Sequence, residues 1–235
     1  MPRADRGRPV VLIVGASRGL GLALAEEYLA RGWHVIATRR GTGRTDLDDL
    51  AERSEDRLER ETIDITDPGQ IAALAQRLAG RALDLLFVNA GIASNVEQQI
   101  AEVPTEDFVR LMVTNALSPM RVLAALEGLV APTGTIAIMS SGLGSIAENE
   151  QGAWAAYAAS KAALNMLMRG FAARRRRDPR PMIIMAPGWV RTDMGGPHAD
   201  LAIEESIPRV VDTVTAQAGR PGLRYLDYTG RIVRW

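Results

Sequence analysis

The sequence predicts a doubly wound α/β fold, with one mostly parallel sheet covered by helices on both faces. Short, continuously apolar runs such as residues 10–14 alternate along the chain with longer Ala- and Leu-rich stretches. Strands that are apolar throughout are buried on both faces, which is typical of a parallel sheet between two helix layers. The 235 residues suffice for one sizeable core, and no internal repeat or low-complexity segment divides them, so we expect a single domain over residues 1–235.

Seven short runs are expected to be strands because β-branched and other apolar residues dominate them. Residues 41–60 are polar and charged instead, and they are expected to hold at most one short helix. The predicted strands are, in chain order, residues 10–14, 34–38, 62–65, 83–88, 135–139, 182–185 and 224–226.

The longer stretches between these strands contain many good helix formers, chiefly Ala and Leu, and are expected to be helices. Pro68 opens one of them, since proline is favoured in the first turn of a helix. Pro119 lies inside another and either bends or breaks it. The predicted helices are residues 20–30, 68–78, 105–130, 153–171 and 203–216.

Composition argues against several classes of protein. Basic and acidic residues balance at 28 each, so no bulk charge attracts the chain to nucleic acid or to a membrane surface. The absence of cysteine excludes disulfides and thiolate metal sites. The apolar run after the basic N-terminus is too short for a signal peptide, and no stretch approaches the ~20 apolar residues of a membrane span. We therefore expect a cytoplasmic protein.

A glycine-rich run follows the first predicted strand, Gly15-Ala16-Ser17-Arg18-Gly19-Leu20-Gly21. Glycines at a strand end let the backbone turn tightly and approach a pyrophosphate, which then lies on the amide groups of the next helix. The run also matches the G-x-S-x-G nucleophile elbow of α/β-hydrolases, with Ser17 as nucleophile. That interpretation is disfavoured because only fourteen residues precede Gly15, and the only histidines, His34 and His198, fall in a predicted strand and a loop.

Tyr157 and Lys161 lie four residues apart in the predicted helix over residues 153–171, and therefore share one face of it. Lys161 is the single lysine of the chain, and the other 27 basic residues are arginines. An ammonium beside a phenol favours the phenolate and lowers the pKa of the phenol. Arginine is a weaker substitute because its wide guanidinium never gives up its proton. The pair predicts proton transfer at this helix face.

The chain resembles the short-chain dehydrogenase/reductase family over nearly its whole length. The motifs that carry this resemblance are, in order, the glycine run, Asn89-Ala90-Gly91, Tyr157-x3-Lys161 and Pro187-Gly188. The resemblance implies a Rossmann-type fold, and it adds Asn115 and Ser141 as the positions that match the family's catalytic Asn and Ser. The loop after Ser141 and the ending Tyr225-Leu226-Asp227-Tyr228 look most like the carbonyl-reductase branch that includes the C-factor and sniffer proteins.

The resemblance implies an oxidoreductase that transfers hydride between a nicotinamide cofactor and a small carbonyl or alcohol, without a metal. Tyr157 would exchange a proton with the substrate oxygen, and Ser141 would hold that oxygen by a hydrogen bond. Lys161 would lower the pKa of Tyr157 and grip the nicotinamide ribose, and Asn115 would hold a water that links the lysine to solvent. The implied cofactor contacts are Gly15, Ser17, Arg18, Gly19, Leu20, Gly21, Arg39, Asp64, Ile65, Asn89, Ala90, Gly91, Tyr157, Lys161, Pro187, Gly188, Val190 and Thr192.

Some positions leave the pattern incomplete. Val14 stands where the family often has Thr, and Val88 stands where it often has a second Asn, so two polar side chains that would brace the neighbouring loops are missing. Asp64 either binds adenine or only caps a turn.

The end of the second predicted strand favours NADP over NAD. Enzymes that choose NAD place an acidic residue there to accept hydrogen bonds from the ribose 2′-hydroxyl. This chain has Thr38-Arg39-Arg40 instead, and guanidinium groups pair bidentately with phosphate. We expect Arg39 and Arg18 to hold the 2′-phosphate, whereas Arg40 is either a third contact or a solvated loop charge.

A second class of function stays open, namely a non-catalytic dinucleotide-binding sensor or signalling protein on the same fold. Loss of one of the four catalytic residue types would mark it, and all four are present. The expected partners are a small-molecule substrate and further copies of the chain. Family members commonly pair through two long helices, here residues 105–130 and the helix that bears Lys161, which implies a homodimer or homotetramer.

Overall fold

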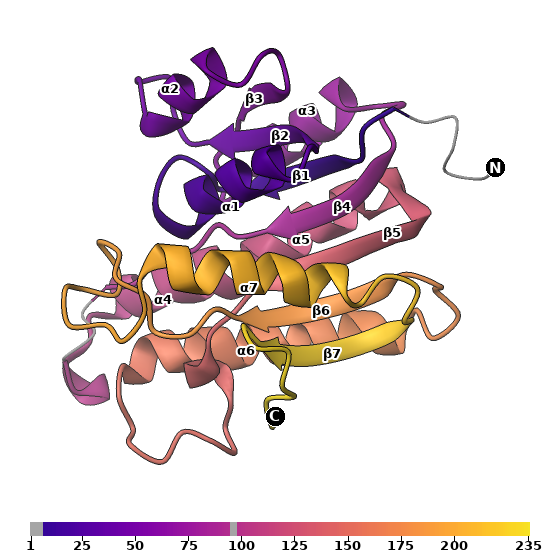
Figure 1. Ribbon diagram of the computed structural model, residues 1–235. Coiled ribbons are helices and arrows are strands. Elements are labelled where there is room, and N and C mark those ends of the chain that lie inside the picture. Colours follow the sequence, from indigo (N-terminus) through magenta and orange to yellow (C-terminus); the bar gives the residue numbers. More distant parts are fainter. Residues whose placement is uncertain (1–6, 95–97) are drawn as a thin grey trace.

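The computed structural model of the chain describes residues 7–94 and 98–235. Within them, seven parallel strands form one sheet in the order β3-β2-β1-β4-β5-β6-β7, which confirms the predicted fold class (Figure 1). The strands are β1 (Val10–Val14), β2 (His34–Arg39), β3 (Leu58–Thr62), β4 (Leu83–Val88), β5 (Val130–Met139), β6 (Pro181–Ala186) and β7 (Gly222–Asp227).

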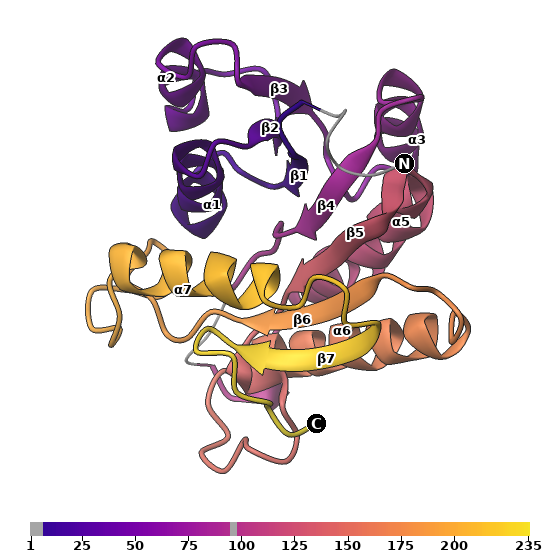
Figure 2. The ribbon, with the colours of Figure 1, turned by 45° about the vertical axis from the view of Figure 1, so that its right-hand side comes forward.

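Two layers of helices cover the sheet, with α1, α2 and α7 on one face and α3, α5 and α6 on the other (Figure 2). Successive side chains of a strand enter opposite cores, so Leu12 packs under the second layer and Ile13 under the first. In the part of the chain that the structure describes, none of the helices combines the length and the apolar character needed to cross a bilayer. The helices are α1 (Gly19–Ala30), α2 (Asp46–Glu52), α3 (Pro68–Arg77), α4 (Thr105–Met112), α5 (Ser118–Leu126), α6 (Ala155–Ala173) and α7 (Ile203–Thr215).

The strand order reverses at β1, which has β2 on one side and β4 on the other. Val14 pairs with Val88, so β1 and β4 end at the same level of the sheet. The loops that begin at Gly15 and Asn89 therefore start side by side, and the backbone amides of Asn89 and Ala90 both donate to the Val14 carbonyl. This edge is the topological switch point, where doubly wound sheets bind their ligands.

The prediction of a third strand over residues 62–65 is wrong, because β3 spans Leu58–Thr62. β3 is an edge strand in which only Leu58 is buried and the middle residues are charged, so it lacks the apolar run expected of a central strand. The apolar signal came from Ile63 and Ile65, which are buried in the core just beyond the strand. Asp64 lies between them in the loop that leads to α3.

The long helix predicted over residues 105–130 is interrupted. α4 passes into a π-helical turn, Val113–Leu117, which is followed by α5. Pro119 lies in the first turn of α5, where its missing N–H is tolerated. The break therefore precedes the proline, and Val130 already belongs to β5. The π turn carries Asn115, in keeping with the frequent occurrence of such turns at functional sites.

Candidate active site

The glycine loop after β1 is packed too tightly for side chains at two positions. A Cβ atom on Gly15, whose φ is +91°, would lie 2.7 Å from the Cα atom of Ala90. A Cβ atom on Gly21 would lie 2.0 Å from the Gly15 carbonyl oxygen. Two side chains brace this loop: the Gly15 amide donates to Thr38 Oγ1 at 2.9 Å, and Asn89 Nδ2 donates to the Gly15 carbonyl at 2.7 Å. They supply polar support that Val14 and Val88 cannot give.

The first turn of α1 has the character of an anion site. The helix begins at Gly19, and its N-cap residue Arg18 makes no side-chain capping hydrogen bond to the first turn. Unsatisfied amides at a helix N-terminus attract negative charge. Arg18 forms an ion pair with Asp193 at 2.9 Å, and both side chains are more than 70% exposed, so water screens the pair and exchange for another anion costs little.

The loop after β6 lies against the glycine loop. A Cβ atom on Gly19 would lie 3.9 Å from the Thr192 methyl group. Gly188 has a φ of +86°, and a Cβ atom there would lie 2.5 Å from Leu201, so glycine is required. Thr192 Oγ1 accepts a hydrogen bond from the Gly195 amide at 3.0 Å, and Val190 is buried. The structure thus brings the Pro187 and Thr192 segment beside the motif after β1.

Three of the predicted catalytic side chains meet where β5 ends and α6 begins. Ser141 follows β5, while Tyr157 and Lys161 lie one turn apart on α6. The Tyr157 and Ser141 side chains form a hydrogen bond. Trp154, which precedes α6 in a left-handed conformation, packs edge-on against the Tyr157 ring at 5.6 Å between centroids. Ser140 is not the exposed hydroxyl of the pair, because it is buried and donates to Asn165, so the choice of Ser141 agrees with the geometry.

Asn115 faces the same centre from the π turn and is fully buried. Its Oδ1 atom accepts from the Ile92 amide at 2.8 Å, and its Nδ2 atom donates to the Ile92 carbonyl at 2.8 Å and to Ser160 Oγ at 3.0 Å. A Cβ atom on Gly91 would lie 3.3 Å from both Asn115 Oδ1 and Lys161 Nζ. The side chains of Asn115 and Lys161 therefore both lie against the Asn89-Ala90-Gly91 loop.

The pKa values correct one expectation. Burial raises the pKa of Tyr157 to about 12, and the hydrogen bond with Ser141 only partly opposes this effect. Lys161 Nζ lies 5.7 Å from the centre of the Tyr157 ring and donates instead to the Met139 carbonyl at 3.2 Å. Burial lowers the pKa of Lys161 to about 8. Desolvation thus dominates for both groups, and the predicted lowering of the Tyr157 pKa is not found.

Arg39 at the end of β2 is held by neighbouring residues. Its Nη1 atom donates to Asp48 Oδ2 at 2.6 Å and to the Gly43 carbonyl at 2.5 Å, and its Nε atom is buried without a hydrogen-bond partner. Asp48 also binds Arg60, so one nearly buried carboxylate joins two guanidinium groups. Arg40 is exposed.

The Asp64 carboxylate accepts hydrogen bonds from the amide and the hydroxyl of Thr66, at 2.8 and 2.7 Å. The carboxylate therefore caps a turn, a contact that does not exclude adenine, and the Asp64 amide donates to Gln70. The neighbouring Ile65 is buried in the core.

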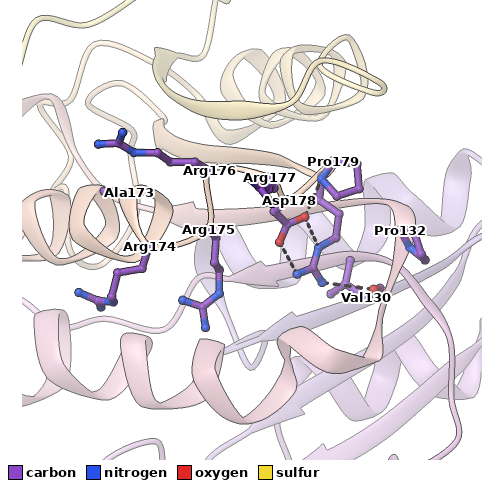
Figure 3. A pocket seen from close by; sticks show the side chains of 10 residues that line it. Val130, Pro132, Ala173, Arg174, Arg175, Arg176, Arg177, Asp178 and Pro179 are labelled. Atoms are coloured by element: carbon purple, nitrogen blue, oxygen red, sulfur yellow. Dashed lines mark hydrogen bonds and ion pairs between the residues drawn. The ribbon is translucent and has the colours of Figure 1, made fainter.

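A surface hollow of about 610 Å³ lies away from this site, at the opposite ends of the strands, between the end of α6 and the starts of β5 and β6. Arginines 174–177 line it, but their side chains diverge, with Arg174 and Arg176 pointing apart (Figure 3). Arg175 is paired with Glu127, and Arg180 with Asp178. The hollow brings none of the predicted site residues together.

Sequence reasoning missed Thr38, Asp48, Asn165 and Tyr225, which hold the loops of the site. Thr38 and Asp48 support the glycine loop and Arg39, and the other two contact the loop that contains Ser141. Most of their partners lie in distant segments, and local spacing does not reveal those contacts. Two of the residues had a local signal: Asn165 follows Lys161 by four residues on the same helix face, and Asp48 follows Thr45 by three, the spacing of a capping box.

The fold and this site define the class of protein. The family model for short chain dehydrogenases matches residues 9–220, and the chain therefore belongs to that family. A solved protein from Burkholderia multivorans, described as a short-chain dehydrogenase/reductase with bound NADP, is 60% identical. Its structure superposes with a TM-score of 0.96 over 97% of this chain and 100% of that one.

Two further proteins are similar to this chain. A carbonyl reductase from Pseudomonas aeruginosa PAO1, solved in complex with NADP, is 40% identical with a TM-score of 0.90, over 97% of this chain and 100% of that one. The C-signal of Myxococcus xanthus is 35% identical over 165 residues, which are 69% of this chain and 99% of that protein. The resemblance to the carbonyl-reductase branch is thereby confirmed.

Proposed function

We propose that the protein is an NADP(H)-dependent oxidoreductase that transfers hydride between nicotinamide and a small carbonyl or alcohol substrate. The observation that carries this proposal is the cluster formed by Ser141, Tyr157, Lys161 and Asn115 beside the Asn89-Ala90-Gly91 loop. It lies at the switch-point edge of the sheet, with a glycine loop and an uncapped helix N-terminus nearby. The NADP-bound structures of the Burkholderia and Pseudomonas relatives support the same cofactor.

The residues present fit a dinucleotide. Gly15 and Gly21 leave room where side chains would collide, and the amides at the start of α1 suit a pyrophosphate. In our proposal Ser17, Gly19 and Leu20 belong to this cradle. The adenosine half is held by Asp64, Ile65, Asn89, Ala90 and Gly91, and the nicotinamide half by Pro187, Gly188, Val190 and Thr192. When bound, the nicotinamide would supply or accept hydride.

The side chains of the cluster transfer the proton and bind the substrate oxygen. In carbonyl reduction Tyr157 donates its phenolic proton to the oxygen as hydride reaches the carbon, and Ser141 donates a hydrogen bond to that oxygen. Lys161, whose pKa of about 8 leaves it mostly protonated at neutral pH, supplies positive charge that favours the tyrosinate formed. Asn115 ties the π turn to the Ile92 backbone and so fixes the position of this loop relative to Lys161.

NADP is preferred over NAD in this proposal because β2 ends in Thr38-Arg39-Arg40 and offers no carboxylate to a 2′-hydroxyl. Asp48 occupies one nitrogen of Arg39, and the other terminal nitrogen is left for a phosphate oxygen. Arg18 would exchange the exposed Asp193 for the same phosphate.

The test is thermal-shift stabilisation by NADPH and NADH, followed by a panel of carbonyl compounds monitored by the loss of reduced-cofactor absorbance. We expect NADPH to be preferred on the order of 100-fold in kcat/KM, since charge-assisted contacts contribute roughly 1.5–3 kcal/mol each and solvent screens part of that. The preference should shrink as salt rises. Equal kcat/KM values would refute the NADP assignment, and tight NADPH binding without turnover on any carbonyl would favour the sensor function.

A further inference from the structure

The loop that contains Ser141 is anchored to α6 at two points by Asn165. Ser140 Oγ, just before the catalytic hydroxyl, donates to Asn165 Oδ1 at 2.7 Å, and Asn165 Nδ2 donates to the Gly144 carbonyl at 3.0 Å. Asn165 is only 3% exposed. Gly144 itself lies so close to the helix that a Cβ atom would be 2.8 Å from Asn165 Nδ2. The amide thus spans the loop from one end to the other.

A second anchor comes from β7. Tyr225 on β7 is 1% exposed, and its hydroxyl donates to the carbonyl of Ser141 itself. A buried hydroxyl that loses its partner, or a buried carbonyl left unpaired, is destabilising, so this contact resists displacement of Ser141. β7 pairs with β6 along its whole length, so the sheet holds the Tyr225 side chain in position.

These anchors connect Ser141 to Tyr157 through rigid elements. Tyr157, Lys161 and Asn165 follow one another at intervals of four on α6 and share one helix face. The residue that anchors the loop therefore moves as one body with the residue that carries the proton. Hydrogen bonding to a developing oxyanion depends steeply on geometry, and a displacement of about 1 Å can cost on the order of 100-fold in rate.

We propose that Tyr225 and Asn165 are positioning residues that hold the Ser141 hydroxyl within hydrogen-bonding distance of the Tyr157 hydroxyl. The inference rests on the proposed function, since it concerns the accuracy of the same site. Neither residue contacts the reacting atoms, and each acts through Ser141.

The first test measures the loop itself and needs no turnover. Amide hydrogen exchange over residues 141–148 should be several-fold faster in Tyr225→Phe than in the wild-type protein. The matched control is Tyr28→Phe, because the Tyr28 hydroxyl is likewise fully buried but has no hydrogen-bond partner. Asn165→Ala should accelerate exchange over the same residues. Unchanged exchange in Tyr225→Phe would overturn the inference, even if no substrate is found.

The second test separates positioning from general stability. Tyr225→Phe should lower kcat roughly tenfold while the KM for NADPH stays the same, and Tyr28→Phe should leave both unchanged. In a Ser141→Ala background, Tyr225→Phe should cause little further loss, because the group that it positions is gone. Equal losses in both backgrounds would show that Tyr225 does not act through Ser141. If the wild-type protein turns over no carbonyl, the proposed function is refuted. The hydrogen-exchange experiment still tests whether Tyr225 and Asn165 hold the loop.

Discussion

Tyr157 and Lys161 show how burial sets the chemistry of a single residue. Desolvation raises the pKa of the phenol to about 12 and lowers that of the ammonium to about 8. Each shift favours the neutral form of its group. The phenol is thus kept protonated, as carbonyl reduction requires, and the tyrosinate left after proton transfer would draw its stabilisation from Lys161 and Ser141.

Tyr157→Phe should abolish turnover and leave NADPH affinity nearly unchanged, since it removes only the transferable proton. The expected loss in kcat is roughly 10²–10⁴-fold, the range of general acid catalysis. Steady-state kinetics and a cofactor titration on the same preparation measure both quantities. A variant that retains more than about a tenth of the wild-type kcat would disprove the assigned role.

The lowered pKa of Lys161 predicts a pH dependence of stability. The folded protein releases this proton near pH 8, whereas the unfolded chain retains it up to about 10.5. The unfolded state therefore binds more protons between these values, and the contribution of Lys161 to the free energy of unfolding increases with pH across that window.

Urea unfolding of the wild-type protein and of Lys161→Met, at several values between pH 7.5 and 9.5, isolates this contribution. The wild-type protein should gain stability relative to the variant as pH rises. A constant difference would mean that Lys161 is not desolvated in the folded protein. The raised pKa of Tyr157 acts in the opposite direction, but only above about pH 10.

At the scale of elements, the sequence predicted every strand except β3, at one edge of the sheet, and it missed the position of the interruption in the helix expected over residues 105–130. β1 is an apolar run and β4 is apolar except for Asp84, as the buried centre of a sheet requires, so composition alone identifies them. β3 pairs on one side only and holds charged residues, and its place depends on pairing with β2 rather than on its own composition. The π turn at Asn115 likewise follows from tertiary hydrogen bonds to Ile92 and Ser160, which no local pattern contains.

Asp48, in the candidate site, likewise makes contacts that its local sequence does not predict. It forms a capping box with Thr45 at the start of α2, and its carboxylate also holds Arg39 and Arg60. Hydrogen bonds and both arginines keep its pKa below the usual range. The first turn of α2 thereby fixes the guanidinium group of Arg39, although a loop separates α2 from β2 in the chain.

Asp48→Asn should reduce the preference for NADPH over NADH roughly fivefold, because it releases Arg39 from its fixed position. Asp49→Asn is the matched control, since Asp49 is on the same helix but pairs with the exposed Arg44. The ratio of the two cofactor dissociation constants is the measurement, and it is insensitive to a general loss of stability. An increased preference in Asp48→Asn would instead show that Asp48 keeps Arg39 away from the phosphate.

At the scale of the whole molecule, apolar side chains are exposed on the helices expected to pair. Met166 and Leu167 on α6 are 67% and 43% exposed, and Val109 on α4 and Leu117 on the π turn are 51% and 40% exposed. Apolar side chains that gather on helices mark association surfaces. The predicted homodimer or homotetramer would cover them.

Met166→Glu should shift the protein toward a 25.4 kDa monomer in sedimentation at micromolar concentration, because it places a charge in the pairing surface. Met194→Glu changes another exposed methionine, outside these helices, and should leave the assembly intact. If the wild-type protein is already a monomer at this concentration, the prediction of assembly is wrong.

The single lysine also makes the protein a reporter of its own opening. A protease that cleaves only after lysine has one possible target in this chain, and that target is buried in the middle of α6. Cleavage must wait for the helix to detach from the sheet, so when reclosing is fast its rate follows the population of open molecules. Each added increment of NADPH should slow the appearance of the two fragments by the factor 1 + [NADPH]/Kd, provided that the open form binds none. A gel would then report both conformational stability and cofactor affinity without a label or a substrate.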